Sequence, residues 1–298
     1  MDGILPLWKP KGFTSHDCVS KARGMLKTKK IGHTGTLDPD VEGVLPLCVG
    51  KATKIVPFLM DTTKVYEAVV TLGYATDTED ASGTTVETSR LDQQPGMQDI
   101  NEVLAAFTGE ITQTPPMYSA VKVNGKKLYE YAREGKTVER PSRKVYISEL
   151  HVTSYDASLK DGTYSFGIRA VCSKGTYIRT LCVDIGKALG FPAHMKSLIR
   201  TETGDIHKED CFTFDAVQEA VDQNRADELL LPLSKGLSHL PSIDVDEETR
   251  DMVKHGRVLD EPDDLEADTF TIQHGQEVAA VYQKHPTKPG YIKPVRVF

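Results

Sequence analysis

Apolar residues recur at the spacing of an amphipathic helix near the start of the chain and again near residue 100. Residues 15–26 collect their apolar side chains on one helical face, and Thr14 or Ser15 can cap the first turn. Residues 99–109 repeat the pattern, with Asp99 as the expected cap and a glycine at the end. Both segments are therefore predicted to form helices.

Alternation of apolar and polar residues marks strands in the middle of the chain. Residues 66–73 are rich in β-branched residues, and residues 164–172 alternate between apolar and polar positions. The second run leads through a short turn into residues 177–190, whose apolar positions follow a helical period and end at a glycine. We therefore predict two strands and a helix that directly follows the second strand.

Polar segments separate these elements. Residues 76–83 have the composition of a turn or loop, and residues 111–144 are mostly polar, with a tight hairpin turn expected at Asn124 and Gly125. The longer segment is predicted to be an excursion from the core. From about Leu240 onward, prolines, an acidic stretch and short β runs predict a separate small β domain. Because helices and strands are interspersed without a regular βαβ alternation, we predict an α+β fold.

The composition excludes several classes of protein. At 298 residues the chain can form one large domain, or one domain with a small appendage. It has no apolar run of about 18 residues, and its first residues do not have the pattern expected of a signal peptide. The segment VGKAT lacks the first glycine and the hydroxyl of a phosphate loop. The five cysteines form no C-x-x-C pair, which predicts reduced thiols, no zinc site and a cytoplasmic location.

The net charge of −7 hides an uneven distribution. Residues 215–268 contain 16 acidic and 5 basic residues, a net of −11, so the rest of the chain has a net of +4. Residues 8–30 and 118–146 are strongly basic, and the second segment also contains four tyrosines. Basic residues among aromatic ones suit contact with a phosphate backbone and unstacked bases. Two solvated surfaces with half-buried tyrosines would have the same composition.

A loop with the sequence GHTGTLDPDVEG, beginning at Gly32, leads into an apolar run. Gly32 and Gly35 allow sharp turns, and Pro39 biases Asp38 toward an extended conformation. Such a loop can hold the Asp38 carboxylate at the mouth of a pocket, whereas an Asx-type turn is the simpler explanation of the same residues. A metal site at His33 would need further ligands, and none cluster nearby in the sequence.

A second cluster, CSKGTYIRT, lies where the predicted strand 164–172 meets the following helix. It brings Lys174, Tyr177 and Arg179 to one strand-to-helix junction, where functional groups are common. The alternative is a solvated cap on the start of the helix.

Seven motifs follow one another over roughly the first 210 residues: KPKGFTS, GHTGTLDP, KVYEA, TDTEDASG, PPMYSAVKVNGKKLYEYAREG, CSKGTYIRTLCVDIG and AHMKSLIRTETG. In this order and spacing they resemble the TruB family of bacterial tRNA pseudouridine synthases. Two positions depart from the family pattern. Val41 stands where alanine is usual after the Asp-Pro turn, which would alter the packing under the loop. Ile199 stands where LRRT has a further arginine beside Arg200, which would remove one phosphate contact.

The resemblance implies an enzyme that isomerises the uridine at position 55 in the T loop of tRNA to pseudouridine. It implies a catalytic domain over residues 1–238, built on a mixed, largely antiparallel sheet with an inserted thumb loop at about residues 111–144. A small β-rich RNA-binding domain of PUA type would follow over residues 239–298. The polar excursion and the change of composition noted above fall at these two places.

The resemblance also implies roles for single residues. Asp38 would be the catalytic carboxylate at the sugar, with Arg179 as its ion-pair partner and Tyr66 stacked on the target base. The other residues expected at the substrate are His33, which would enter the RNA when the target nucleotide flips out, and Lys9, Leu198, Tyr177, Lys174, Lys126 and Lys127. No cofactor, metal or protein partner is implied; the expected partner is the T arm of tRNA, and a monomer is the expected state.

Two other functions would use the same basic and aromatic segments to contact RNA. A glycosidase-like hydrolase would also place a carboxylate at an anomeric carbon, but it needs a second carboxylate in a defined role. A non-catalytic RNA chaperone would open the elbow of the tRNA. The resemblance leaves open whether Asp38 adds to C1′ or promotes elimination to a glycal, and whether Tyr66 is the base. Hydrolysis would release the base, a chaperone would leave it unchanged, and a synthase would yield an isomer of unchanged mass.

Overall fold

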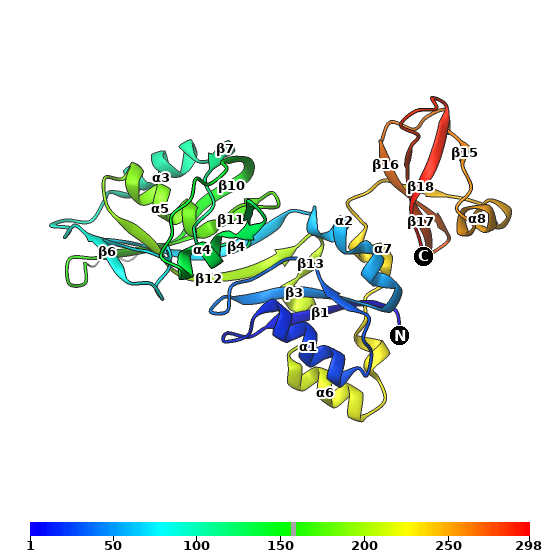
Figure 1. Ribbon diagram of the computed structural model, residues 1–298, viewed down its shortest axis with the longest axis horizontal. Helices are drawn as coiled ribbons and strands as arrows, with labels where there is room; N and C mark the ends of the chain where they lie inside the picture. Colours follow the sequence, from blue (N-terminus) through cyan, green and yellow to red (C-terminus); the bar gives the residue numbers. More distant parts are fainter. Residues whose placement is uncertain (156–158) are drawn as a thin grey trace. The chain divides into compact units, whose positions relative to one another are not determined.

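The computed structural model describes residues 1–155 and 159–298 (Figure 1). They form two compact units: unit 1 comprises residues 1–62 and 202–298, and unit 2 comprises residues 63–201. Both units contain helices and strands, in agreement with the predicted α+β class. In the described ranges no helix is long and apolar enough to cross a membrane.

The N-terminal part of unit 1 is built on short antiparallel strands. β1 (Gly3–Lys9) pairs with β3 (Glu42–Val49), from Gly3 opposite Val49 to Lys9 opposite Gly43. β2 (Ile31–His33) pairs with the end of β3. Because β1 and β3 are buried almost throughout, both strands are apolar along nearly their whole length rather than alternating.

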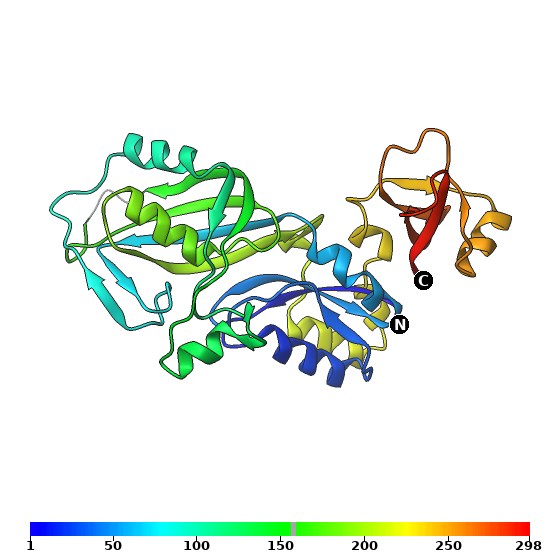
Figure 2. The ribbon, with the colours of Figure 1, turned by 45° about the horizontal axis from the view of Figure 1, so that its top comes forward.

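The helices α1 (Ser15–Met25) and α6 (Phe214–Asp222) pack against each other in unit 1 (Figure 2). α1 begins where the sequence predicts: the Thr14 hydroxyl accepts a hydrogen bond from the Asp17 backbone N–H at 3.0 Å, and the Asp17 carboxylate accepts one from the Thr14 N–H at 2.9 Å. The predicted apolar face of α1 is buried in a cluster shared with β1 and α6. Reciprocal capping and burial of one face therefore define this helix.

Short helical turns and one short strand complete this part of unit 1. They are η1 (Gly50–Ile55), α2 (Val56–Met60), β13 (Ile206–His207), η2 (Lys208–Asp210), η3 (Ala226–Leu229) and α7 (Leu233–Gly236). The segment that superficially resembles a phosphate loop forms the end of β3 and the 3₁₀ turn η1.

The C-terminal β runs form a five-stranded sheet. Its strand order is β14 (Ser242–Asp244), β16 (Thr269–His274), β17 (Glu277–Lys284), β18 (Tyr291–Val297) and β15 (Leu259–Asp260), and α8 (Glu247–Lys254) packs against it. β14 and β16 are parallel, and the other three pairs are antiparallel. The three predicted runs are β16, β17 and β18, whereas the domain boundary expected after residue 238 stays a prediction.

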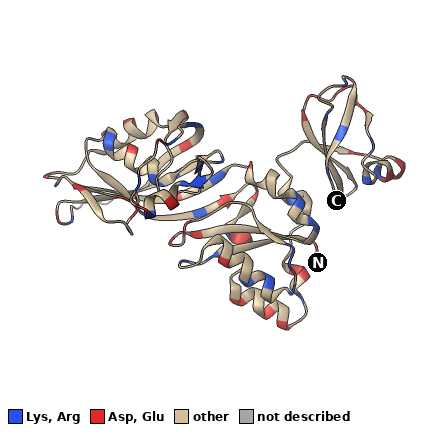
Figure 3. Ribbon diagram, in the orientation of Figure 1, with Lys and Arg blue, Asp and Glu red and all other residues tan. Residues whose placement is uncertain are grey.

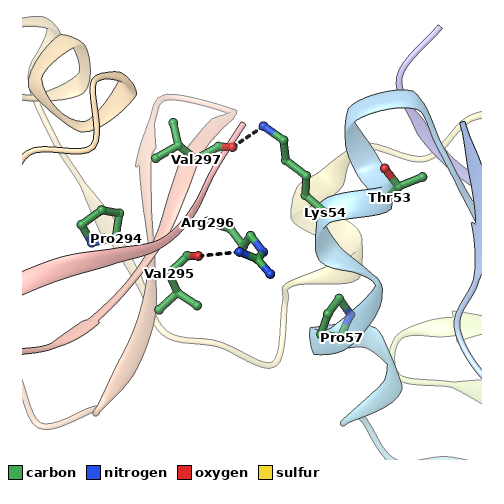
Figure 4. A pocket seen from close by; sticks show the side chains of 7 residues that line it. All are labelled: Thr53, Lys54, Pro57, Pro294, Val295, Arg296 and Val297. Carbon is green, nitrogen blue, oxygen red and sulfur yellow. Dashed lines mark hydrogen bonds between the residues drawn. The ribbon is translucent and has the colours of Figure 1, made fainter. Parts of the chain in front are cut away.

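The C-terminal strands share a hydrophobic cluster with the N-terminal part of unit 1. The cluster includes Ile4, Ile55 and Val281, all of which are fully buried. Beside it, the Lys54 ammonium donates a hydrogen bond to the Val297 carbonyl at 2.6 Å, at the edge of a hollow of about 560 Å³ (Figure 4). Apolar packing therefore holds the C-terminal sheet to the first strands of the chain.

Unit 2 is built on five strands covered by two helices. The strand order is β12 (Ala193–Thr203), β4 (Lys64–Leu72), β11 (Tyr164–Cys172), β10 (Arg143–Tyr155) and β7 (Gly109–Gln113). The pairs β4–β11, β11–β10 and β10–β7 are antiparallel. α5 (Ile178–Ala188) packs on β4 and α3 (Met97–Ala106) on β10, while a hairpin of β5 (Tyr74–Thr76) and β6 (Thr85–Thr88) follows β4. The predicted strands and the helix after the second strand are confirmed.

The polar excursion contains the predicted hairpin and one helix that the sequence pattern did not indicate. β8 (Lys122–Val123) and β9 (Lys126–Lys127) pair through Asn124 and Gly125, whose φ angles of 51° and 81° fit the predicted tight turn. α4 (Leu128–Arg133) follows, and its Leu128 is fully buried. A helix with one fully buried leucine shows no periodic apolar pattern, so the sequence did not indicate α4. The assignment of this segment as a thumb loop stays a prediction.

The start of α3 differs from the prediction. The cap is Gly96, and Asp99 is the third helical residue, where its carboxylate accepts the Gly96 backbone N–H at 3.1 Å. An acidic residue stabilises a helix start both as the cap and three positions later, so Asp99 by itself does not define the first residue.

Replacing Val281 with alanine should lower the free energy of unfolding by about 2 kcal/mol, because it removes buried methyl groups and leaves a cavity. Urea unfolding followed by circular dichroism measures the change. Val258→Ala, at a position that is 48% exposed, is the control and should change the free energy by less than about 0.5 kcal/mol. Equal unfolding midpoints for the two variants would show that the cluster around Val281 does not stabilise the fold.

Candidate active site

The loop between β2 and β3 is held on one side by a buried serine. The Ser15 hydroxyl oxygen accepts the Leu37 backbone N–H at 2.9 Å and lies 3.4 Å from the Leu37 carbonyl, to which it donates. Both residues are buried, and Ser15 is the first residue of α1. The residue that precedes Asp38 is therefore fixed to the start of a helix.

The other side of the loop is held by Lys9, which is fully buried at the end of β1. Its ammonium donates hydrogen bonds to the carbonyl oxygens of Pro10 and Pro39, each at 3.0 Å, and to that of Val41. A buried ammonium is tolerated only when such acceptors replace its hydration. Lys9 thus fixes the backbone that immediately follows Asp38.

Asp38 is half-buried and lies between these two anchors. Its backbone carbonyl accepts the Val41 N–H at 3.1 Å, which closes a tight turn over Pro39 and Asp40. The backbone of Asp38 is therefore held on both sides, as a carboxylate with a fixed direction requires.

The turn before Asp38 depends on one of the two glycines expected to make it. Gly35 has a φ of 149°, a conformation that favours glycine. Gly32 lies in β2 opposite Cys48, so the prediction that Gly32 turns the chain is wrong: strand pairing keeps this residue in a regular ladder. His33 ends β2, is half-buried, and accepts the Gly35 N–H on Nδ1 at 3.3 Å.

Tyr66 and Leu198 lie on neighbouring strands of unit 2. Tyr66 is half-buried on β4, opposite Ala170 of β11. Leu198 is buried on β12, which borders β4 on its other side. The strand order thus places an aromatic and an aliphatic residue, far apart in the sequence, on adjacent strands.

Arg179 is the second residue of α5 and is almost fully buried. Its Nη1 donates to the Thr78 carbonyl at 3.0 Å, and its Nη2 donates to the Tyr118 carbonyl at 2.8 Å. The Asp80 carboxylate lies 3.9 Å from Nη1. Contacts on two guanidinium nitrogens fix the plane of the group, and its burial does not fit a solvated cap on the helix.

The residue before α5 is held by Gln113, which the sequence did not single out. Gln113 Nε2 donates to the Tyr177 carbonyl at 3.1 Å, and the Tyr177 N–H donates to Gln113 Oε1 at 3.0 Å. The Arg143 guanidinium lies 4.6 Å from the centre of the Tyr177 ring and donates to the carbonyl of Gly175, which follows Lys174 in the same turn. Gln113 is 64 positions from Tyr177, so no local pattern could have indicated this contact.

Lys126 and Lys127 lie in β9, among the basic residues around α4 (Figure 3). Lys126 forms an ion pair with Glu134 and lies 4.8 Å from the centre of the Tyr131 ring. Lys127 lies 5.4 Å from the centre of the Tyr129 ring. A carboxylate therefore lies beside each of them, since the Lys127 backbone N–H donates to Glu130 Oε2 at 2.8 Å.

Neither a cluster of metal-binding residues nor the hollow in Figure 4 involves the predicted site residues in the described ranges. Residues 1–155 and 159–298 contain no group of three or more His, Cys, Asp or Glu residues that could hold a metal ion. The described residues that line the hollow in Figure 4 include none of the predicted site residues: they are Thr53, Lys54, Pro57, Pro294, Val295, Arg296 and Val297.

The sequence matches two family descriptions in succession. "TruB family pseudouridylate synthase (N terminal domain)" matches residues 23–178, and "tRNA pseudouridylate synthase B C-terminal domain" matches residues 179–238. The chain belongs to the TruB family. This confirms the resemblance based on the seven motifs, and it makes the chain an enzyme of the isomerase class.

Curated members of the TruB family match this chain over its whole length. The relatives from Oceanobacillus iheyensis, Halalkalibacterium halodurans and Geobacillus thermodenitrificans are 57%, 51% and 50% identical to it. The alignments cover 100% of this chain and 98%, 97% and 100% of the respective relatives. Each of the three is named tRNA pseudouridine synthase B.

Two solved structures resemble the fold of this TruB-family chain. A chain of "Crystal Structure of a Cbf5-Nop10-Gar1 Complex" is 27% identical, with a TM-score of 0.76 over 99% of this chain and 84% of that chain. A chain of "Structure of H/ACA RNP bound to a substrate RNA containing 2'-deoxyuridine" is 25% identical, with a TM-score of 0.73 over 99% of this chain and 84% of that chain. These likenesses agree with the α+β fold described above.

Replacing Lys9 with methionine should speed amide hydrogen exchange in the Asp38 loop by at least about tenfold, because the buried carbonyl groups lose their donor. Hydrogen–deuterium exchange of the peptide that contains Val41 measures this change. Lys11→Met is the control, since Lys11 is exposed and lies two residues further on. Unchanged exchange in Lys9→Met would mean that other contacts hold the loop.

Proposed function

We propose that the chain converts the uridine at position 55 in the T loop of tRNA to pseudouridine, with Asp38 as the catalytic carboxylate. The observation that carries the proposal is the double anchoring of the Asp38 loop by Ser15 and Lys9 in a member of the TruB family. The name of the relatives, tRNA pseudouridine synthase B, supports tRNA as the substrate.

The reaction explains why a single fixed carboxylate is needed. Uracil must leave C1′ through N1, rotate, and return through C5. C5 then loses its proton and N1 gains one, so that the product has the mass of the substrate. Asp38 either adds to C1′ or stabilises positive charge there while the base is detached. No atom is gained or lost, and no water needs activation. The reaction therefore depends on orientation, which a doubly anchored loop supplies.

Four other residues complete the proposed chemistry. Arg179 pairs with Asp38 and keeps it ionised and oriented. Tyr66 stacks on the target base, and Leu198 forms an apolar wall beside it. The target nucleotide flips out of the RNA at a cost of a few kcal/mol, and the His33 ring fills the space that it leaves.

The basic segments would bind the RNA backbone. In the polar excursion, Lys127 and Arg133 both lie against the Tyr129 ring, at 5.4 Å and 5.2 Å, which suits phosphate contact beside a stacked base. Lys126, Lys174 and Tyr177 extend this proposed surface. Residues 1–238 form the catalytic domain in this proposal, residues 239–298 a PUA-like RNA-binding domain, and the enzyme acts as a monomer without a protein partner.

Asp38→Asn should abolish turnover while tRNA affinity changes by less than about tenfold, roughly 1.4 kcal/mol. The substitution keeps the shape of the side chain but removes its charge and nucleophilicity. The assay is pseudouridine formation in a T-arm transcript at saturating enzyme, with binding measured separately. Asp40→Asn, at an exposed position of the same loop, is the control and should turn over normally. Substantial pseudouridine from Asp38→Asn, or free uracil from the wild type, would refute the proposal.

Affinity for tRNA should fall steeply as salt rises, because cations of the protein displace counterions from the phosphates. Replacing Lys127 and Arg133 with glutamine should reduce the slope of log affinity against log salt by about one for each phosphate that the variant no longer neutralises. Lys187→Gln with Lys208→Gln removes the same charge from exposed positions elsewhere and should leave the slope unchanged. If both double variants showed the same slope of log affinity against log salt, the excursion would not be part of the RNA-binding surface.

A further inference from the structure

Glu79 lies in the loop between β5 and β6 in a backbone conformation that residues other than glycine rarely adopt. Its φ is 65°. The conformation is held on both sides, since the Glu79 N–H donates to the Thr76 carbonyl at 3.2 Å and the Glu79 carbonyl accepts the Met195 N–H at 3.0 Å. A strained backbone that is held in this way often serves a functional site.

The Glu79 side chain contacts the first turn of α5. The Thr180 hydroxyl donates to Glu79 Oε2 at 2.8 Å, and Thr180 directly follows Arg179. The two neighbours of Glu79 approach the same turn: the Thr78 carbonyl accepts from Arg179 Nη1 at 3.0 Å, and the Asp80 carboxylate lies 3.9 Å from that nitrogen. Three consecutive residues of the loop therefore face the start of one helix.

The Glu79 carboxylate depends on its hydrogen bond to Thr180 because its surroundings give it little hydration. Burial raises the pKa of Glu79, and the hydrogen bond from Thr180 opposes this shift, as do the positive charges of Arg179 and Arg140. The negative charge of Asp184, like burial, raises the pKa of Glu79. A carboxylate with little access to water depends on the partners that it touches, so the Glu79–Thr180 contact resists displacement by water.

We propose that Glu79 is a positioning residue, which anchors the first turn of α5 through Thr180 and thereby fixes the direction of the Arg179 guanidinium. The inference rests on the proposed role of Arg179 beside Asp38. Asp80 forms a long ion pair with Arg179 itself, at 3.9 Å, whereas Glu79 acts on the helix through the Thr180 hydroxyl. The carbonyl groups of Thr78 and Tyr118 fix the plane of the guanidinium, and the Glu79–Thr180 contact fixes the position of the helix that carries it.

The experiment compares single-turnover rates at saturating enzyme with separately measured tRNA affinities. Glu79→Ala should slow the rate by about ten- to a hundredfold, since a displacement of about 1 Å can cost a hundredfold, and affinity should change by less than about threefold. Glu79→Gln keeps an oxygen that accepts from Thr180 and should retain most of the rate. Wild-type turnover by Glu79→Ala would overturn the inference, as would a loss confined to affinity.

Thr180 provides an independent test that does not alter the strained residue. Thr180→Val removes the hydroxyl and should slow the rate as much as Glu79→Ala, whereas Thr180→Ser restores it. The double variant of Glu79→Ala and Thr180→Val should be no slower than either single one, because both remove the same hydrogen bond. Losses that multiply in the double variant would refute the anchoring. Asp184→Asn, which removes a half-buried carboxylate that belongs to α5 itself, is the control and should turn over normally.

Arg179→Lys separates failure of the inference from failure of the proposed function. Lysine keeps the charge but cannot form the two parallel hydrogen bonds by which a planar guanidinium binds a carboxylate. If Arg179→Lys is slow and Glu79→Ala is fast, Arg179 keeps its role and the inference about Glu79 is wrong. If Arg179→Lys turns over like the wild type, the proposed pairing with Asp38 is wrong whatever the Glu79 variants do. Thermal unfolding of each variant confirms that it is folded.

Discussion

The Asp38 loop depends on the hydrogen bonds between the buried ammonium of Lys9 and backbone carbonyl groups. A charge removed from water is tolerated only when hydrogen bonds replace its hydration, and Lys9 finds acceptors in the carbonyl groups of Pro10, Pro39 and Val41. These carbonyl groups need a donor as much as Lys9 needs acceptors, because a loop lacks the regular partners of a strand. One side chain therefore satisfies several buried polar groups and at the same time fixes the residues around Asp38.

The start of α5 in unit 2 follows the same rule with different groups. The first backbone N–H groups of a helix and the polar groups of a loop have no partners within their own element. Gln113 satisfies the backbone of Tyr177, and Glu79 accepts from Thr180. Because each contact joins two elements, satisfying the polar groups also fixes how the elements lie against each other, and with them the buried guanidinium of Arg179.

This construction suits a reaction that needs little beyond orientation. The proposed chemistry detaches and reattaches a base on one face of a sugar, so a carboxylate and a cation held in fixed directions matter more than a set of titrating groups. The departure from the family pattern at Val41 is compatible with this arrangement. Val41 is buried, and its carbonyl accepts from Lys9.

The sequence by itself determined the local elements and the family. The helix cap at Thr14, the hairpin at Asn124 and Gly125, and the strand that leads into α5 all depend on residues a few positions apart, so local patterns predicted them. Only the tertiary structure decided which distant polar groups meet: Gln113 with Tyr177 across 64 positions, and Glu79 with Thr180 across 101. Periodicity cannot indicate such pairs, because their partners are chosen by the order of strands in the sheet and by the burial that removes water from both groups.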